Sequence, residues 1–400
     1  MKIQTSSEWK TIKFGDVADF NVQNTDKTYP YQDIEYVDIS AVETGSLRET
    51  GKYKFSEAPG RARRMVKSGD TIIANVRPNR RSFFYFKKPK ENLVVSTGFT
   101  VITPREASLD NRYAYYVISN QAFTDYLVNH AKGSAYPAVD TDTFKNAKIT
   151  IPNLQNQKNI AGILSAYDDL IENNNRRIKV LEEMAQKIYT KWFVYFRFPG
   201  VKRDIDSIDT LPYGWRVGKL GDLVEVIKES VNPKELPEDF PYIGIEHLPR
   251  KSWVFNGFGR SNEANSNKSR LKKGDILFGN IRPYFHKVLL APIVGICSSD
   301  IVVLRPKNSS YSGYTFLTVF SKTFIAQATT TSKGTKMPRG DWEALINYPV
   351  LIPSDDTLNH FESVFVDLAD SARELNLTNE NLKQARDLLI PKLVSGEIRV

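Results

Sequence analysis

Apolar residues recur along residues 154–192 at steps of four and three that alternate without interruption. The recurring positions are Ile160, Leu164, Tyr167, Ile171, Asn174, Ile178, Leu181, Ala185, Ile188 and Trp192. Nine of these ten residues are apolar, and most residues between them are charged or carry amides. This heptad pattern predicts one long helix whose apolar seam packs against another helix. A helix of these 39 residues would be about 58 Å long.

A second seam with the same rhythm follows 201 residues later. Its positions are Phe361, Phe365, Leu368, Ala372, Leu375, Asn379, Leu382, Arg386, Leu389 and Leu393. Each seam contains one asparagine, Asn174 or Asn379, and a buried amide restricts register because it needs a partner. We predict that the two helices pair within the chain, and pseudo-symmetry favours an antiparallel pair. Ordinary amphipathic core helices are the alternative, but such helices are seldom this long.

The whole chain is a tandem duplication. The matching segments are 9–16 and 215–222, 69–78 and 274–283, 101–104 and 303–306, 133–137 and 334–338, and 149–152 and 350–353. The offset drifts from 206 residues at the start to 201 at the helices, so loop lengths differ slightly between the repeats. A repeated unit of this kind predicts two copies of one domain.

The fold class that we predict is α+β, with two mixed α/β domains separated by two long antiparallel helices that form a coiled-coil spacer. The predicted segments are a first domain at 1–152, a central helix at 153–198, a second domain at 199–353 and a C-terminal helix at 354–400. Residues 71–76 and 276–281 indicate buried strands entered through a Gly-Asp turn, and residues 111–128 indicate a helix.

Proline, glycine and polar runs mark the expected ends of these segments. We expect the central helix to end at Pro199-Gly200, residues 201–212 to be a polar linker, and Pro391 to kink or end the last helix. Ile163, Leu170 and Phe193 flank the seam and are expected to be exposed, which suggests that the chain depends on partners for stability.

Composition fits a protein of two or three soluble domains in a reducing compartment. The chain has 400 residues with 41% hydrophobic residues, and its single cysteine, Cys297, is expected to be a small core residue. No signal peptide and no run of about 18 apolar residues is visible, so neither export nor a membrane span is expected.

Positive charge is concentrated in one part of the first domain. Residues 51–100 contain 12 Lys or Arg against 3 Asp or Glu, whereas residues 1–50 contain 5 against 9. The basic and amide residues of the first domain are Arg61, Arg63, Arg64, Lys67, Arg77, Asn79, Arg80 and Arg81. The corresponding residues of the second domain are Lys268, Arg270, Lys272, Lys273, Arg282, Tyr284, His286 and Lys287. Arginine suits guanine edges and phosphates and asparagine suits adenine, so matched clusters in two repeats predict DNA contact rather than only a solvated charged face.

A glycine-containing loop recurs in both domains. Residues 132–137 (KGSAYP) correspond to residues 333–338 (KGTKMP). Glycine permits close approach of the backbone to a ligand, and lysine can meet a phosphate. The candidate DNA-binding residues are Lys132, Ser134, Tyr136, Lys333, Thr335 and Lys336. A purely structural turn is the alternative.

Signatures of catalysis are absent from the sequence. It contains no phosphate-binding glycine loop with a Lys-Ser/Thr end, no Gly-x-Ser-x-Gly, no His-Glu-x-x-His and no paired Cys-x-x-Cys. The four histidines, His130, His247, His286 and His360, do not have metal-ligand spacing. We therefore predict no catalytic residue and no metal site.

The ordered set of motifs, present twice, resembles the specificity subunits of type I restriction–modification systems. Each repeat begins with Trp-x-x-x-x-x-Gly-Asp, at Trp9 and Trp215, and continues with a Gly-Asp strand followed by Asn-x-Arg-Pro. An Ile-Pro segment precedes each long helix, and the helix sequences at 160–171 and 388–396 are also typical of this family. The resemblance covers the full chain. It implies a non-catalytic protein with an antiparallel helical spacer and a target-recognition domain at each end, each domain reading one part of a bipartite DNA site.

The same resemblance implies partners. Two modification (methyltransferase) subunits would dock on the spacer helices, and restriction subunits would join through the assembled complex. S-adenosylmethionine, ATP and magnesium would belong to those partners, with no cofactor in this chain. The expected location is the cytoplasm of a bacterium or archaeon. Because the two clusters differ between the repeats, we predict an asymmetric target.

Two other function classes remain open from the residues alone. A DNA methyltransferase or nuclease with an unrecognised active site is one, although [DN]PP[YF] and a glycine-rich cofactor loop are missing. A coiled-coil scaffold that joins proteins without DNA is the other. Methyl transfer by the chain alone would establish the first, and DNA binding without any sequence preference would favour the second.

Overall fold

The computed structural model describes residues 9–26, 28–200, 211–255 and 257–400, and this part of the chain forms two compact units. The first unit is Met1–Ile171 with Asn381–Val400, and the second is Glu172–Glu380. Each unit contains a strand-rich head and a part of each long helix, α4 (Leu154–Tyr189) and α9 (Asp355–Ser395). Most of the predicted linker, residues 201–210, lies outside the described residues.

Two four-stranded sheets form the first head. The first sheet is antiparallel, in the order β2 (Ala18–Phe20), β11 (Phe99–Pro104), β8 (Thr71–Ala74), β9 (Phe83–Tyr85). The second has the order β6 (Gly51–Lys54), β3 (Asp33–Val37), β10 (Leu93–Ser96), β7 (Ala62–Met65), with β3 and β10 parallel. Two small pairs, β1 (Lys10–Lys13) with β12 (Lys148–Ile151) and β4 (Val42–Glu43) with β5 (Ser46–Leu47), complete the strands. The helices are α1 (Asn111–Ser119), α2 (Gln121–His130) and α3 (Thr141–Asn146), with 3₁₀ turns η1 (Phe14–Asp16), η2 (Ile39–Ala41), η3 (Phe55–Glu57) and η4 (Pro78–Arg80).

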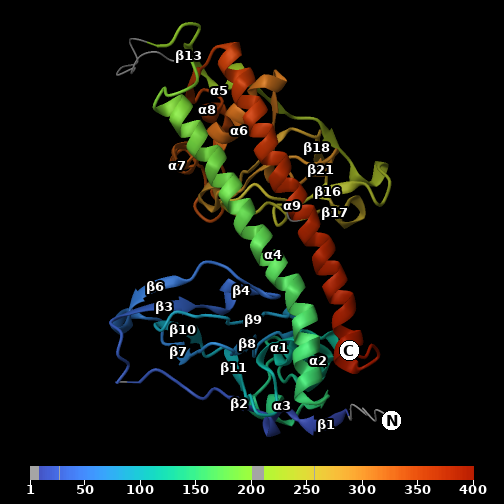
Figure 1. Ribbon diagram of the computed structural model, residues 1–400. Coiled ribbons are helices and arrows are strands. Elements are labelled where there is room, and N and C mark those ends of the chain that lie inside the picture. Colours follow the sequence, from blue (N-terminus) through green and yellow to red (C-terminus); the bar gives the residue numbers. More distant parts are fainter. Residues whose placement is uncertain (1–8, 27, 201–210, 256) are drawn as a thin grey trace. The chain divides into compact units, whose positions relative to one another are not determined.

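Strand alternation gives the first head its layers. Ile72 and Ala74 of β8 face a core between the two sheets, whereas Ile73 faces a core shared with α1 and α2. Ile160 of α4 and Leu393 of α9 belong to this second core. Figure 1 shows α1 and α2 beside the first-unit part of α4. The head is therefore held to both helices by one continuous apolar cluster.

The second head repeats this topology. Its antiparallel sheet has the order β14 (Val224–Ile227), β22 (Ile301–Pro306), β19 (Ile276–Gly279), β20 (Val288–Leu290). Its other sheet has the order β15 (Ser230–Val231), β18 (Lys268–Leu271), β21 (Gly295–Cys297), β16 (Pro241–Ile243), β17 (Gly259–Arg260). The pair β13 (Arg216–Lys219) and β23 (Pro349–Ile352) matches β1 and β12. The helices are α5 (Leu220–Leu223), α6 (Ser312–Phe320), α7 (Lys322–Thr330) and α8 (Trp342–Leu345), with 3₁₀ turns η7 (Pro233–Glu235), η8 (Ser261–Glu263), η9 (Pro283–Phe285) and η10 (Ser309–Tyr311). The parallel pair β16 and β21 corresponds to β3 and β10, so the duplication seen in the sequence is a duplication of the fold.

The Gly-Asp turns lead into the central strands as predicted. Gly69 and Gly274 both have φ +90°, a value that glycine adopts without strain. The carboxylates of Asp70 and Asp275 accept from the backbone N–H of Lys67 and Lys272, at 2.8 and 2.7 Å. The strands that follow end two residues earlier than predicted, at Ala74 and Gly279.

The predicted heptad seams are the buried faces of α4 and α9. None of the twenty seam residues is exposed. Within the second unit, the Asn174 amide donates to the Asn379 carbonyl oxygen at 2.9 Å, and the rings of Trp192 and Phe361 lie 5.6 Å apart. Along α4 the residue number rises from Asn174 to Trp192, whereas their partners on α9 fall from Asn379 to Phe361. The two helices therefore run antiparallel within this unit.

Three local predictions were wrong. Residues 111–128 form two helices, because Asn120 has ψ 138° and its side chain caps α2 through the N–H of Ala122. Of the kink or end expected at Pro391, the end does not occur, because α9 continues to Ser395. Pro391 and Asp387 are both exposed, so the carbonyl that loses its partner can be hydrated.

The third error concerns the end of the central helix. α4 ends at Tyr189 and is followed by a π-helical turn, Thr190–Val194, rather than continuing to Pro199. The wider turn places the consecutive residues Trp192 and Phe193 both in the core, so Phe193 is 4% exposed instead of solvent-facing. Ile163 and Leu170 are exposed, as predicted.

Candidate DNA interface

In the first head, the two candidate segments lie side by side. We call Arg77–Arg81 the first turn and Lys132–Pro137 the first glycine loop. The backbone N–H of Arg77 donates to the carbonyl of Pro137 at 2.7 Å, and Val76 bridges to Ala138. Together they form a continuous structure that we call the first edge.

The second head repeats this contact. The second turn is Arg282–His286, and the second glycine loop is Lys333–Pro338. The N–H of Arg282 donates to the carbonyl of Pro338 at 2.7 Å, and Ile281 bridges to Arg339. We call this pair of segments the second edge, and both edges join residues that are more than 50 positions apart in the sequence.

Both turns have an unusual backbone. A 3₁₀ helix (η4 or η9) lies between two left-handed residues, which are Arg77 and Arg81 in the first turn and Arg282 and His286 in the second, with φ 50–53°. Left-handed non-glycine residues cost about 1–3 kcal/mol each and persist only where the surroundings hold them. The same strained backbone in both repeats indicates that the turn is held in place by contacts outside itself.

Those contacts include the carbonyl of the last residue of α1 in the first head and of α6 in the second. Arg81 donates to the Ser119 carbonyl at 2.5 Å and also to the Gln121 side chain. His286 donates from Nε2 to the Phe320 carbonyl at 2.8 Å, and its ring lies 4.4 Å from the Phe320 ring. Burial lowers the pKa of His286, which keeps the imidazole neutral at pH 7. Arg81 and His286 therefore act as anchors of their turns.

The glycine loops are closed by equivalent ion pairs. Lys132 lies 3.5 Å from Asp140, and Lys333 lies 2.7 Å from Asp341. Each aspartate also caps the following short helix, α3 or α8. The pKa of Asp140 is lowered mainly by its hydrogen bonds to Thr143, and that of Asp341 mainly by Lys333.

Side chains at the tips of the edges face solvent. Gly133 and Gly334 have φ 96° and 101°, and a Cβ on Gly133 would meet the Tyr136 carbonyl oxygen at 3.1 Å. The exposed predicted residues of the two edges are Asn79, Arg80, Lys132, Ser134, Tyr136, Tyr284, Lys333, Thr335 and Lys336.

The other predicted basic residues divide into exposed and internally bonded ones. Arg61, Arg63, Lys67, Lys272 and Lys273 are exposed, and Arg63 also donates to the Gly60 carbonyl at 3.2 Å. The internally bonded residues are Arg64, which donates to Asn21 at 2.6 Å; Arg270, which lies 3.0 Å from Glu229; Lys287, which donates to the Ile245 carbonyl; and buried Lys268, which donates to Ser266 at 2.7 and 2.8 Å. Burial also lowers the pKa of Arg64. The contacts of Arg64, Arg270 and Lys287 depend on partners about 40 residues away and had no signal in the sequence, whereas Lys268 bonds to a residue two positions before it.

One basic residue beside the second edge was missed by the sequence analysis. The guanidinium carbon of Arg250 lies 3.9 Å from the centre of the Phe285 ring. In the first edge, the guanidinium of Arg77 lies 4.3 Å from the ring centre of Tyr136. Arg250 belongs to no motif shared by the repeats, so only the tertiary contact indicates its place.

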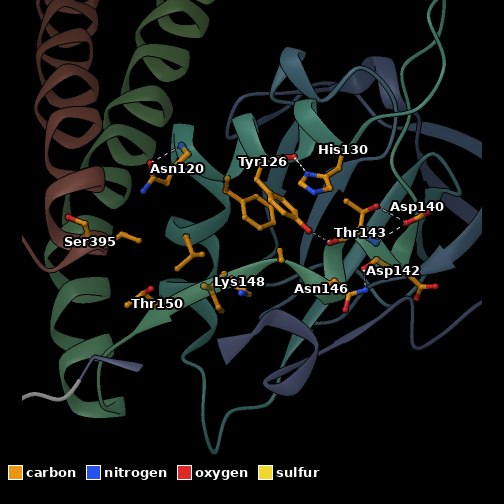
Figure 2. Close-up of a pocket in the computed structure, with 16 residues that line it drawn as sticks. Asn120, Tyr126, His130, Asp140, Asp142, Thr143, Asn146, Lys148, Thr150 and Ser395 are labelled. Carbon is orange, nitrogen blue, oxygen red and sulfur yellow. Dashed lines mark hydrogen bonds between the residues drawn. The ribbon is translucent and has the colours of Figure 1, made fainter. Parts of the chain in front are cut away.

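An open pocket of about 800 Å³ lies between α2, α3, β12 and the end of α9 in the first unit. Figure 2 shows its walls: Tyr126 and His130 of α2, Thr143 of α3, Lys148 of β12 and Ser395 at the end of α9. His130 Nδ1 lies 2.8 Å from the Tyr126 carbonyl oxygen, and the Tyr126 hydroxyl donates to the Thr143 carbonyl at 3.0 Å. These contacts connect and cap helices, and no nucleophile with an adjacent base is formed here.

Groups of metal-ligand type do not gather in the described part of the chain: it contains no cluster of three His, Cys, Asp or Glu side chains placed to hold an ion. Cys297 is buried between the sheets of the second head, and burial raises the pKa of its thiol to about 12, so it is a core residue as predicted. Among the described residues, no helix is long and apolar enough to cross a membrane.

Two tandem copies of one α/β head, each joined to a long helix and each presenting the same turn-and-loop edge, define a duplicated two-domain protein. The sequence profile of the type I restriction modification DNA specificity domain matches residues 6–183 and 212–360. The chain therefore belongs to the family of type I restriction–modification specificity subunits, as its motifs indicated.

Named relatives agree with this assignment. The chain is 27% identical to the type I restriction enzyme MjaIX specificity subunit of Methanocaldococcus jannaschii over 79% of this chain and 75% of the relative. It is 19% identical to the HindI specificity subunit of Haemophilus influenzae over 98% of this chain and 100% of the relative. The crystal structure of a type I system S subunit from M. genitalium matches with a TM-score of 0.56 at 16% identity, covering 98% of each chain, and this likeness supports the fold alone.

Proposed function

We propose that this chain is the sequence-specific double-stranded DNA-binding subunit of a type I restriction–modification complex in the cytoplasm of a bacterium or archaeon. Each head reads one part of an asymmetric bipartite site. The observation that carries this proposal is the recurrence of one edge in both heads, with the same strained backbone but different exposed side chains. The same backbone in both repeats, with different side chains on it, suits two domains that bind different DNA sequences.

The exposed residues of the edges are the proposed DNA contacts. Asn79 and Arg80 of the first turn correspond to Tyr284 and Phe285 of the second. Arginine and asparagine present donors to base edges, whereas tyrosine offers an apolar face and one hydroxyl. Exposed Arg61 and Arg63, at the start of β7 in the first head, would contact phosphates, which carry no sequence information. Arg81 and His286 would support binding by holding the turns.

In this proposal, the two long helices fix the distance between the DNA-binding heads. α4 and α9 are unbroken helices of 36 and 41 residues, and each contributes residues to both units. A helix of 36 residues is about 54 Å long. We infer that the two helices pair antiparallel along their whole length as a coiled-coil spacer, because their seams are covered within each unit. Such a spacer would set the number of unread base pairs between the two half-sites.

Partner subunits complete the proposed complex. Two modification subunits would dock on the spacer, and restriction subunits would join through them. Exposed apolar side chains on both helices, including Ile163, Leu170, Val180 and Leu377, are consistent with docking of protein partners. S-adenosylmethionine, ATP and magnesium would be bound by those partners, and this chain would act without catalysis of its own.

This fixed distance can be tested with the DNA site selected by the chain from a random duplex pool. Insertion of one base pair between the half-sites should lower specific affinity by at least about tenfold, since one reader then loses its register. Mutation of one half-site alone is the control. Unchanged affinity for the inserted site would contradict a rigid spacer.

The first edge can be tested separately. Replacement of Arg77 and Arg80 by alanine should weaken binding to the intact site by about 10- to 1,000-fold. The same replacement should have little further effect on DNA whose first half-site is already mutated. An equal loss on both DNAs would show that these arginines contact only the backbone.

A further inference from the structure

We propose that Arg250 reads a guanine in the half-site bound by the second head, and that Phe285 holds it in position. In the first head, Tyr136 holds Arg77 for the same task. This inference rests on the proposed function and adds to it a base reader outside the repeated motifs, together with the class of base that each half-site must contain.

The backbone next to Arg250 is fixed to the second turn. The N–H of Lys251 donates to the carbonyl of His286 at 2.8 Å, and Lys251 has φ 56°, a left-handed conformation. Leu248, on the other side, is 1% exposed in the core between the sheets. Arg250 thus leaves a short, anchored segment, and its own side chain is exposed beside the turn.

The side chain of Arg250 is held by stacking. Its guanidinium lies 3.9 Å from the Phe285 ring centre, and the Phe285 ring is itself supported edge-on by Tyr284 at 4.9 Å. A stacked guanidinium keeps its plane, while its outer N–H groups remain directed away from the ring. A fork held in this way loses less side-chain entropy when it binds.

Guanine is the base that this fork fits. Its O6 and N7 are two acceptors side by side in the major groove, and arginine can donate to both at once. Arg282 is a weaker candidate, because its guanidinium lies 5.9 Å from the same ring and donates to the Lys336 carbonyl at 3.3 Å. We assign Arg282 to holding the second glycine loop against the turn.

The two edges build the same stack from different segments. In the first edge the arginine is on the turn and the aromatic residue, Tyr136, is on the glycine loop. In the second edge the aromatic residue, Phe285, is on the turn, and the loop position that corresponds to Tyr136 is Met337. A contact needed only for the fold would be expected to use the same positions in both repeats. Its reconstruction from different positions indicates that the stacked arginine itself is the selected feature.

The experiment is selection of bound sequences from a pool of randomised DNA duplexes by the full chain, co-expressed with the modification subunits of its own system. The wild-type chain should select a bipartite motif with at least one guanine in each half. Arg250→Ala and Arg250→Lys should both lose the preference for guanine at one position of one half-site, by about 10- to 100-fold, and leave the other half unchanged. Lysine keeps the charge but not the fork, so the lysine variant separates base reading from attraction to phosphate.

The first edge provides an independent arm. Tyr136→Ala should weaken the guanine preference at one position of the other half-site, and Tyr136→Phe should retain it, because phenylalanine keeps the stacking face. Arg216→Ala is the matched control: Arg216 is an exposed arginine of β13 that lies 3.7 Å from Asp222, and its removal should leave the motif unchanged. Circular dichroism of every variant verifies that it folds.

Three results would overturn the inference. Loss of affinity by the Arg250 variants that is equal for all sequences, with a salt dependence lowered by about one counterion, would assign Arg250 to a phosphate. If the Arg250 variants select the same DNA motif as the wild-type chain, the contact between Arg250 and Phe285 has no role in base recognition. Failure of the wild-type chain to select any motif would instead overturn the proposed function, on which this inference rests.

Discussion

The two units join head to helices at equivalent positions with different chemistry. Shifted by 201 residues, Ile160 and Leu164 of α4 in the first unit correspond to Phe361 and Phe365 of α9 in the second. All four are buried. The first unit fills this junction with aliphatic side chains, and the second fills it with aromatic rings.

In the first unit, ion pairs join the head to α4 beside the neutral hydrogen bonds of buried Gln157, which accepts from the Asp110 N–H and donates to the Ser108 carbonyl. Asp169 of α4 lies 2.6 Å from Lys87 and 2.9 Å from Arg112, and about half of its side chain is exposed. The hydroxyl of Tyr116 donates to Asp168 of the same helix at 2.6 Å. Exposed ion pairs are screened by salt, so part of this junction should respond to ionic strength.

The second unit uses two carboxylates, one buried and one half-buried, that accept from N–H and O–H donors. Glu182 of α4 accepts from the Ser252 hydroxyl at 2.6 Å and the Trp253 N–H at 2.9 Å. Glu362 of α9 accepts from the Gly313 N–H at 2.6 Å. Burial raises the pKa of both carboxyls, to about 7 for Glu362. The comparison teaches that one duplicated frame tolerates different contacts between head and helix: those of the first unit depend partly on salt, and those of the second depend on aromatic packing and pH.

The largest effect should come from the aromatic junction. Phe361→Ala should destabilise the second unit by about 3–5 kcal/mol, because it removes a ring that is 0% exposed and leaves a cavity. Urea unfolding followed by tryptophan fluorescence measures this, since four of the five tryptophans, Trp192, Trp215, Trp253 and Trp342, belong to this unit. Phe361→Leu, which keeps much of the volume, should lose less than half as much. Equal losses would contradict the cavity explanation.

Removal of the buried carboxylate should have the next largest effect. Glu182→Ala should cost about 2–3 kcal/mol, because the Trp253 N–H and Ser252 hydroxyl lose their acceptor. Glu182→Gln keeps a carbonyl oxygen there and should cost clearly less in the same unfolding experiment. If both substitutions cost the same, the carboxylate is not what holds this segment of the second head.

Glu362 should make the stability of the second unit depend on pH. Its pKa is about 7 in the folded chain against an ordinary value of 4.5, so its protonation favours folding below pH 4.5, and this stability is lost as pH rises through 7. The loss between pH 5 and 8 should be about 1–2 kcal/mol after allowance for partial solvent exposure. Glu362→Gln should flatten this dependence in urea unfolding across that range. A parallel decline in the variant would assign the effect to other groups.

Removal of the ion pairs between Asp169 and the first head should have the smallest effect on stability. Asp169→Asn should destabilise the first unit by less than about 1 kcal/mol in low salt, and the difference should vanish near about 1 M NaCl. Hydrogen exchange of the Arg112 region measures this locally, where the tryptophan signal of the second unit does not interfere. A loss that is independent of salt would show that Asp169 acts through packing rather than charge.

Much of the frame could be predicted from residue patterns. The seams of α4 and α9, the duplication and the Gly-Asp turns all depend on spacing or on one residue's backbone preference. Errors arose where neighbours in space intervened. Asn120 divides a predicted helix by capping the next one, and a π turn carries Phe193 into the core. Neither the helix break nor the π turn changes the spacing of apolar residues enough to be predicted from the sequence.

The candidate interface shows the same limit more sharply. Both the arginine-containing turns and the glycine loops were recognised in the sequence, but their contact with each other in each head was not predicted. Arg64, Arg81, His286 and Lys287 were selected for their charge, but each is bonded to a carbonyl or amide that the fold brings from at least 34 residues away. Arg250 was passed over because no repeat or motif marked it.

The sequence by itself determined the duplication, the two long helices and the positions of the Gly-Asp turns, because these depend on periodicity and on local backbone preference. Only the tertiary structure decided which cations remain exposed and which anchor the fold. A guanidinium or an imidazole binds whichever acceptor lies within about 3 Å, and that acceptor belongs to another segment of the chain.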